Sequence, residues 1–415
     1  MTSGAGVELG QRVRWLIRKI LACVSVGVTA TVVVATTISL LPGHSLLQEY
    51  VGMLWTNAAS RLVVLAVVGL LLALAVRRPW SRPRIAIVVV ALVAVTGSVG
   101  QVVRIAIATA TAGGSVNPFA ELFPGAAASP APDVTEIYHR ADGRDLTVSV
   151  WKPESGGGPA PVIFNIHGGG WMDQNGNGTE QAAAFGPEAA WYAERGWLAV
   201  SVDYRLSDDD HATWDESPAD VACALIWTAR NAGRFGGDGS RIAVLGGSAG
   251  GNLAINLAYS AAQGSAVSSC GGKVPVPAAV VATVPVVDPR NAYDHGVPIP
   301  GSEPKHFIGN YIGGTPEDHP DRIAAISSAT YLTGHAPPTL IIEPEEDGFI
   351  PSEAVFAFAE QARQAGVDVT VAGLPVINHF PFTYDTMANQ AIRTITAAFL
   401  DRQPLFAPNQ GASEK

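Results

Sequence analysis

The chain has 415 residues, which is too long for one small domain, and its formal charge is −10, from 26 Lys and Arg against 36 Asp and Glu. So few cations argue against a nucleic-acid partner, because phosphate binding needs clustered Lys and Arg. The cysteines Cys23, Cys223 and Cys270 form no CxxC motif and no cluster with histidine, which argues against a zinc site. Cys223 and Cys270 either pair, if their domain lies outside the cytoplasm, or stay two separate thiols.

Three apolar stretches open the chain, at about residues 20–41, 53–76 and 85–103. Each approaches the ~20 apolar residues that a helix needs to cross a bilayer. A cleaved signal peptide would account for the first stretch alone. We therefore predict that residues 1–112 form a membrane domain with three transmembrane helices.

Basic residues orient these predicted spans. The segment before the first span and the link between the second and third are rich in cations, whereas residues 42–50 have none; the cations are Arg12, Arg14, Arg18, Lys19, Arg77, Arg78, Arg82 and Arg84. By the positive-inside rule the chain leaves the third span on the outer side, so the following domain is expected to be extracytoplasmic. Arg61 falls inside the second span as drawn, where it either snorkels to the interface or is a functional intramembrane charge.

The remainder of the chain changes character at about residue 113. Residues 113–133 are rich in Gly, Ala and Pro and are predicted to be a linker that holds the next domain off the bilayer, and residues 404–415 a disordered tail. In residues 134–403, short β-branched runs alternate with amphipathic segments, which is typical of a largely parallel sheet with crossover helices. Strands are expected at 135–138, 146–151, 162–166, 198–202, 242–245, 280–286, 339–342 and 367–372, and helices at 180–195, 218–235, 249–262, 351–365 and 384–400.

Ser248 lies between a predicted strand and a predicted helix, in the run Gly-Gly-Ser-Ala-Gly at residues 246–250. Small neighbours are what a strained strand-to-helix turn requires, because larger side chains would collide with the adjoining strand and helix. Such a turn presents the serine hydroxyl at the helix N-terminus. The pattern predicts that Ser248 is the nucleophile of an α/β-hydrolase fold, although a lone GxSxG run also occurs as an ordinary glycine-rich turn.

An apolar strand ends in a second glycine-rich run, His-Gly-Gly-Gly-Trp at residues 167–171. A tetrahedral oxyanion must be met by N–H donors about 3 Å away, and glycines allow the backbone to approach that closely. We expect an oxyanion hole made by donors from Gly168, Gly169 and Gly170 together with the N–H of Ala249. A phosphate-binding loop is the competing interpretation, but the run lacks GK[ST]. His167 is expected to be structural.

The order of a hydrolase triad in this fold is serine, acid, histidine. Asp347 follows the predicted strand at 339–342 and precedes a glycine turn, which makes it the best candidate for the acid. His379 follows the last predicted strand and is the candidate base, which would take the proton of Ser248 while Asp347 holds the imidazole. Three nearby carboxylates are rivals for the acid: Glu343, Glu345 and Glu346.

Taken together, these motifs resemble the hormone-sensitive-lipase-like and acetyl-esterase group of α/β-hydrolases, over roughly residues 134–400. Besides the serine turn and the HGGGW loop, the chain has Asp-Tyr-Arg-Leu at 203–206, where such esterases carry a segment that supports the oxyanion loop, and Ser217-Pro-Ala-Asp220. The resemblance implies cofactor-free hydrolysis of carboxylic esters. The family's substrate-covering N-terminal segment is replaced here by the three spans, and residues 288–337 are a plausible lid over the acyl site.

The resulting prediction is a membrane-anchored serine carboxylesterase or lipase that acts on small-molecule or lipid esters through an acyl-enzyme on Ser248, with no cofactor and no metal. An acyltransferase would use the same residues, because the two activities differ only in whether water or another alcohol takes the acyl group. A peptidase with the same triad, or a non-catalytic membrane interaction module on a hydrolase scaffold, are further alternatives.

Overall fold

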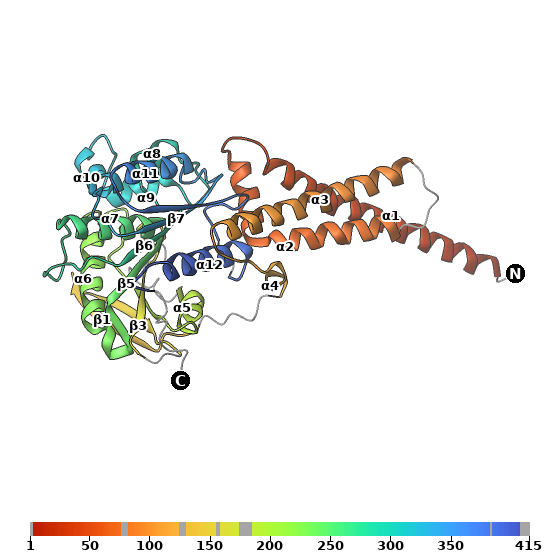
Figure 1. The fold of residues 1–415 in the computed structure, drawn as a ribbon. Coiled ribbons are helices and arrows are strands. Elements are labelled where there is room, and N and C mark those ends of the chain that lie inside the picture. Colours follow the sequence, from red (N-terminus) through yellow and green to blue (C-terminus); the bar gives the residue numbers. More distant parts are fainter. Residues whose placement is uncertain are drawn as a thin grey trace.

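The computed structural model of the protein describes residues 3–75, 82–123, 130–154, 158–173, 185–381 and 384–406. Three long helices, α1 (Ser3–Ile38), α2 (Leu46–Ala75) and α3 (Arg82–Thr111), pack against one another and project from a domain built on one sheet (Figure 1). Each contains a stretch long and apolar enough to cross a membrane. In the described part of the chain these three candidate spans agree in number with the prediction.

The central sheet has eight strands in the order β1-β2-β4-β3-β5-β6-β7-β8. β1 pairs with β2 and β2 with β4 in antiparallel fashion, while all other neighbours are parallel, so the predicted mostly parallel sheet is confirmed. The strands are β1 (Val134–Ala141), β2 (Arg144–Trp151), β3 (Ala160–Ile166), β4 (Leu198–Val202), β5 (Gly237–Gly247), β6 (Ala279–Thr283), β7 (Thr339–Pro344) and β8 (Val369–Leu374).

Helices cover both faces of the sheet. Successive side chains of a strand point to opposite faces, so each strand contributes residues to two apolar cores. In β3, for example, Phe164 belongs to one core and Ile163 to the other. The first core contains residues of α6 (Glu216–Asn231), α7 (Ala249–Gln263) and α11 (Ser352–Gln364). The second contains residues of α5 (Gly186–Ala193), α12 (Met387–Asp401) and the long N-terminal helices. Short helices complete the domain: α4 (Pro118–Leu122), α8 (Pro289–His295), α9 (Pro304–Ile312) and α10 (Pro320–Ile326).

Some boundaries differ from the sequence prediction. The strand expected to run to residue 286 ends at Thr283, because Val284 takes a positive φ of 46° that a strand cannot continue through. The helix expected at 218–235 ends at Asn231 and continues as a 3₁₀ turn, Ala232–Phe235. Residues 180–184 of the helix expected at 180–195 and residues 407–415 of the predicted tail lie outside the described residues. Phe406, within that predicted tail, is buried against Trp197.

The first residues of the predicted linker are hydrogen-bonded to α2 and α12, so they do not form a free spacer between the helices and the sheet domain. The backbone N–H of Asn117 donates to Gln390 Oε1 of α12 at 2.7 Å. The carboxylate of Glu121 in α4 accepts from the N–H of Ser60 in α2 at 3.1 Å and from that of Met387 in α12 at 3.2 Å. Arg61, left open between two interpretations, donates to the carbonyl of Glu121 at 3.2 Å. The start of this segment therefore lies against α12 of the domain that contains the sheet, while the predicted domain boundaries stay predictions.

Helix α2 is broken at Ala58, where φ is −153° and ψ is 27°. The turns before the break lie against the domain that contains the sheet: Thr56 hydrogen-bonds Asn378, and Asn57 hydrogen-bonds Phe380. The second span was predicted to begin at residue 53. In the structure two residues at the start of that predicted span, Thr56 and Asn57, hydrogen-bond the loop that follows β8.

Candidate active site

The predicted site residues follow four strands of the parallel part of the sheet, in which β6 lies between the second and the third of them. Ser248 follows β5, Asp347 follows β7 and His379 follows β8, while the glycine run from Gly168 follows β3. Because parallel strands have their carboxyl ends at one edge of the sheet, these segments meet there. The sheet order thus explains how residues more than a hundred positions apart share one site.

Ser248 occupies a strained backbone conformation, with φ 55° and ψ −121°, between the end of β5 and the first turn of α7. The turn is tight on both sides. A Cβ on Gly246 would lie 2.1 Å from the carbonyl oxygen of Gly250, and a Cβ on Gly250 would lie 2.2 Å from that of Ile166. Neither distance can accommodate a side chain, which is the physical reason for the glycines that the sequence places two residues before and after the serine.

The structure brings Ser248, His379 and Asp347 into one hydrogen-bonded row. The hydroxyl of Ser248 lies 2.9 Å from Nε2 of His379, and Nδ1 of His379 lies 2.8 Å from Oδ2 of Asp347. The other oxygen of Asp347 accepts from the N–H of Ile350 at 3.0 Å. Asp347 is fully buried and His379 is 5% exposed. This arrangement can activate a serine hydroxyl and hold the imidazole in the required tautomer.

The three rival carboxylates lie elsewhere. Glu345 is exposed and Glu346 half-buried. Glu343 is fully buried in β7, and burial, followed by the nearby charge of Asp347, raises the pKa of its carboxyl well above the ordinary value. Such surroundings favour the neutral form of the carboxyl group, whereas a histidine base requires an ionised acid beside it. Of the four acidic candidates, Asp347 is the one that contacts His379.

The glycine loop after β3 lies against the serine turn. A Cβ on Gly168 would lie 2.8 Å from the carbonyl oxygen of Gly247, and one on Gly170 would lie 2.6 Å from the ring of Phe307 in α9. Gly169 and Gly170 both have positive φ, which favours glycine. Ala249 is the first residue of α7, where backbone N–H groups have no acceptor within the helix. The loop and Ala249 flank the serine, and their role as oxyanion donors stays a prediction.

His167 begins this loop and is held by it. Its Nδ1 lies 2.7 Å from the carbonyl oxygen of Gly168, and its ring stacks on Tyr204, whose hydroxyl donates to the His167 carbonyl at 2.9 Å. Burial lowers the pKa of His167 to about 4, so the imidazole is neutral at physiological pH. These contacts fit the structural role expected for it.

The segment after β4 supports the glycine loop from the other side. Ser207 donates from both its N–H and its hydroxyl to the carbonyl of Trp171, at 2.8 and 2.9 Å. Arg205 makes a two-pronged pair with Asp220 of α6, at 2.8 and 3.0 Å, in which Asp220 is fully buried. The Asp-Tyr-Arg-Leu and Ser-Pro-Ala-Asp motifs therefore meet in space.

Aromatic side chains surround the histidine. The ring of Phe349 lies 4.9 Å from that of His379 and 4.9 Å from that of Phe380, with Phe307 of α9 6.3 Å from Phe349. Phe307 belongs to the segment predicted to be a lid, and it is half-buried. These rings make one apolar wall beside the row of three hydrogen-bonded residues, which suits a hydrophobic part of a substrate.

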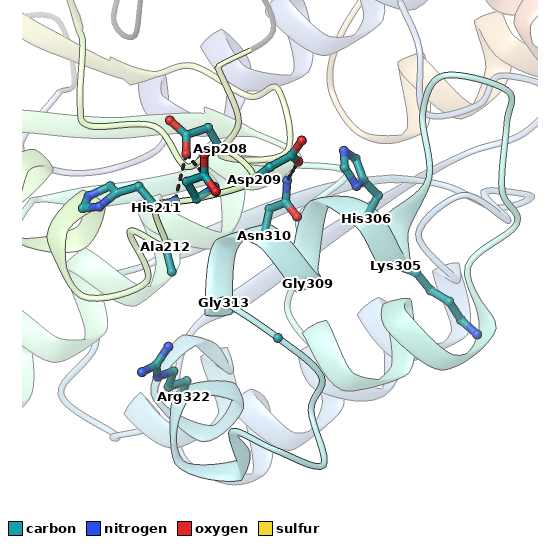
Figure 2. Close-up of a pocket in the computed structure, with 12 residues that line it drawn as sticks. Asp208, Asp209, His211, Ala212, Lys305, His306, Gly309, Asn310, Gly313 and Arg322 are labelled. Carbon is teal, nitrogen blue, oxygen red and sulfur yellow. Dashed lines mark hydrogen bonds between the residues drawn. The ribbon is translucent and has the colours of Figure 1, made fainter.

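A separate polar pocket of about 620 Å³ lies between α9 and the loop that follows β4 (Figure 2). Asn310 of α9 donates to Asp209 at 2.8 Å across one wall. Within the described residues, no three His, Cys, Asp or Glu side chains are grouped so as to hold a metal ion, and the three aspartates here are no exception. The charged and polar residues that line the pocket are Asp208, Asp209, Asp210, His211, Lys305, His306, Asn310 and Arg322.

Cys223 and Cys270 form a disulfide, with Cα atoms 5.4 Å apart. The sequence left open whether they pair. Cys223 lies in α6 and is 1% exposed. The bond ties this helix to the segment that follows α7.

Three residues of α2 reach the catalytic loops and were not among the predicted site residues: Glu49, Thr56 and Asn57. The signal available in the sequence was weak. Polar side chains recur at the start of a run that is otherwise apolar, and Glu49 and Thr56 are seven positions apart, which places them on one helix face.

Comparison with known proteins agrees with this geometry. The BD-FAE family model matches residues 148–361, which is more than half of the chain. The chain belongs to the BD-FAE family. It is similar to the esterase LipQ of Mycobacterium tuberculosis, with 31% identity over 65% of this chain and 62% of LipQ. It is also similar to the esterase LipC of the same organism, with 30% identity over 49% of each chain.

Among solved structures, this BD-FAE family member is similar to Thermogutta terrifontis esterase 2 phosphonylated by sarin, with a TM-score of 0.55 and 23% identity over 69% of this chain and 99% of that one. That likeness shows a shared α/β-hydrolase fold. The chain spans less than two thirds of the length of the curated relatives LipQ and LipC.

Proposed function

We propose that this protein is a membrane-anchored serine carboxylesterase in which Ser248 forms an acyl-enzyme. The observation that carries the proposal is the hydrogen-bonded row from Ser248 through His379 to Asp347, at the edge of the sheet where the glycine loop also lies. Membership of the BD-FAE family and similarity to mycobacterial esterases support the same chemistry.

In the first half-reaction the oxygen of Ser248 attacks the carbonyl carbon of the ester while Nε2 of His379 takes the hydroxyl proton. The resulting oxyanion is stabilised by backbone N–H groups of Gly168 to Gly170 and of Ala249. The intermediate collapses with cleavage of the bond to the alcohol oxygen, which takes the proton from His379. Asp347 stabilises the imidazolium that exists between these two transfers.

In the second half-reaction a water molecule attacks the acyl carbon, with His379 again acting as the base. The carboxylic acid leaves and the proton returns to the oxygen of Ser248. The wall made by Phe307, Phe349 and Phe380 suits an apolar acyl or alcohol group, and this favours an ester with at least one hydrophobic side.

We further infer that the hydrolase domain lies on the outer side of a membrane. The cations before α1 and around the link between α2 and α3 favour a cytoplasmic location for those segments. The disulfide between Cys223 and Cys270 supports the same orientation, since such bonds persist in oxidising compartments.

A fluorophosphonate probe tests this function directly. The full-length protein in detergent should take up one probe molecule, and peptide mass spectrometry should locate it on the oxygen of Ser248. Ser248→Ala should stay unlabelled, and Ser260→Ala, which changes a serine in the body of α7, should label as the wild type does. Equal labelling of wild type and Ser248→Ala would refute the proposed nucleophile.

A further inference from the structure

The loops that carry the predicted acid and base are both held from outside the hydrolase domain, by the first turns of α2. Oε1 of Glu49 accepts from the N–H of Gly348, the residue after Asp347, at 3.0 Å. The side-chain amide of Asn378, the residue before His379, donates to the Glu49 carbonyl at 2.9 Å and lies 3.4 Å from Oε2. Glu49 is 1% exposed. One side chain therefore contacts both catalytic loops.

Further contacts from the same helix fix the histidine loop. The N–H of Asn378 donates to Oγ1 of Thr56 at 2.7 Å, and the side-chain amide of Asn57 donates to the carbonyl of Phe380 at 2.8 Å. The two residues that flank His379 in the chain are thus bonded to α2. Between Glu49 and Thr56 the helix comes close, since a Cβ on Gly52 would lie 3.0 Å from the Cβ of Asn378.

Glu49 and His44 also lie close to the loop that carries Asp347. A Cβ on Gly348 would lie 2.5 Å from Oε1 of Glu49 and 2.6 Å from Cβ of His44. The helical geometry of α2 is interrupted at Ala58, directly after these contacts. We call residues 46–57 the docking segment. The break separates this segment from the apolar remainder of α2, so the docking segment can follow the surface of the hydrolase domain while the remainder follows α1 and α3.

We propose that Glu49 is a positioning residue for the hydrogen-bonded row of Ser248, His379 and Asp347. It acts through Gly348 and Asn378, and it sets the position of Asp347 relative to His379. The inference rests on the proposed esterase function. The Asp347–His379 hydrogen bond joins two loops from different strands, and a carboxylate that contacts both restrains their separation. In an active site a misplacement of about 1 Å can cost about 100-fold in rate. The docking segment of a candidate membrane helix then completes the active site.

The test compares Glu49→Ala and Glu49→Gln in the full-length protein, with p-nitrophenyl acetate as substrate. Glu49→Ala should lower kcat by about 10- to 100-fold while KM changes by less than about threefold, because the loops lose their common partner but the substrate-binding wall is kept. Glu49→Gln should recover most of kcat, since its amide oxygen can accept from the N–H of Gly348 while its main-chain carbonyl still accepts from the side chain of Asn378. Thr56→Val, which removes the acceptor for the N–H of Asn378, should lower kcat in the same way.

Glu353→Ala is the matched control. It removes the hydrogen bond of 3.2 Å between Glu353 of α11 and His44, which lies next to the docking segment, and should leave kcat and KM unchanged. Size-exclusion profile and Tm establish folding for each variant. A folded Glu49→Ala with wild-type kcat, or equal losses in Glu49→Ala and Glu49→Gln, would overturn the positioning role while the esterase function stands. Wild-type activity no higher than that of Ser248→Ala would overturn both.

Discussion

Replacing Asp347 by asparagine changes one oxygen of a fully buried carboxylate that lies 2.8 Å from Nδ1 of His379. The amide is nearly isosteric, so Ile350 can still donate to it. It can, however, present N–H to Nδ1, which leaves the ring proton on Nε2. An imidazole in that tautomer cannot accept the proton of Ser248. In the serine protease triad the corresponding change lowers kcat by about 10⁴, which corresponds to about 5 kcal/mol of transition-state stabilisation.

The assay is steady-state hydrolysis of a p-nitrophenyl ester, with the rate of fluorophosphonate labelling as a measure of nucleophile activation. Asp347→Asn should lower both rates by about 10³- to 10⁴-fold with an unchanged Tm. Matched controls are the same acid-to-amide change at the three rivals, which should alter kcat by less than about threefold: Glu343→Gln, Glu345→Gln and Glu346→Gln. A loss below tenfold in Asp347→Asn, or a loss of 10³ at a rival, would refute the assignment of the acid.

Three further predictions concern stability. Burial lowers the pKa of His167 from 6.5 to about 4, so between these pH values the imidazole is protonated in the unfolded chain and neutral in the folded one. The free energy of unfolding should therefore fall by about 3 kcal/mol as the pH drops through this window. Tm measured over a pH series should change less for His167→Gln than for the wild type. Burial raises the pKa of Glu343 above 4.5, so the unfolded chain loses this proton first and the wild type loses stability as the pH rises past that value. The Tm of Glu343→Gln minus that of the wild type should therefore increase from pH 4.5 to pH 8. A difference in Tm that stays constant with pH would contradict this. Joint replacement of Cys223 and Cys270 by serine should lower unfolding free energy by about 2–4 kcal/mol, measured by denaturant titration, and reductant should lower the wild type to the same level.

The site could be anticipated from sequence because its chemistry imposes local requirements. Gly246 and Gly250 flank Ser248 because no Cβ fits at either position. This steric requirement can be recognised in the sequence as the five-residue pattern at 246–250. Asp347 and His379 were predicted from their order and from their position after strands, and the structure places them within hydrogen-bond distance of each other. The parallel sheet then brings all of them to one edge, so that predicting the strands was enough to predict the meeting of the three residues.

The docking of α2 could not be anticipated in the same way. The hydrogen bond from Gly348 to Glu49 joins residues 299 positions apart, and hydropathy describes only how apolar a helix is. In the structure Val51 and Trp55 of the docking segment belong to the second core, whereas Leu47 and Leu54 are exposed. Pairing of the two cysteines depended likewise on a distance between segments that the sequence does not contain.

The proposed role of Ser248 in ester hydrolysis can be measured with p-nitrophenyl esters of graded acyl length, using the full-length protein with Ser248→Ala beside it. The rates should vary with acyl length, because the wall of Phe307, Phe349 and Phe380 contacts different groups, and they should fall at least about 10³-fold in Ser248→Ala. Rates that are flat across the series and equal in the wild type and Ser248→Ala would contradict this role.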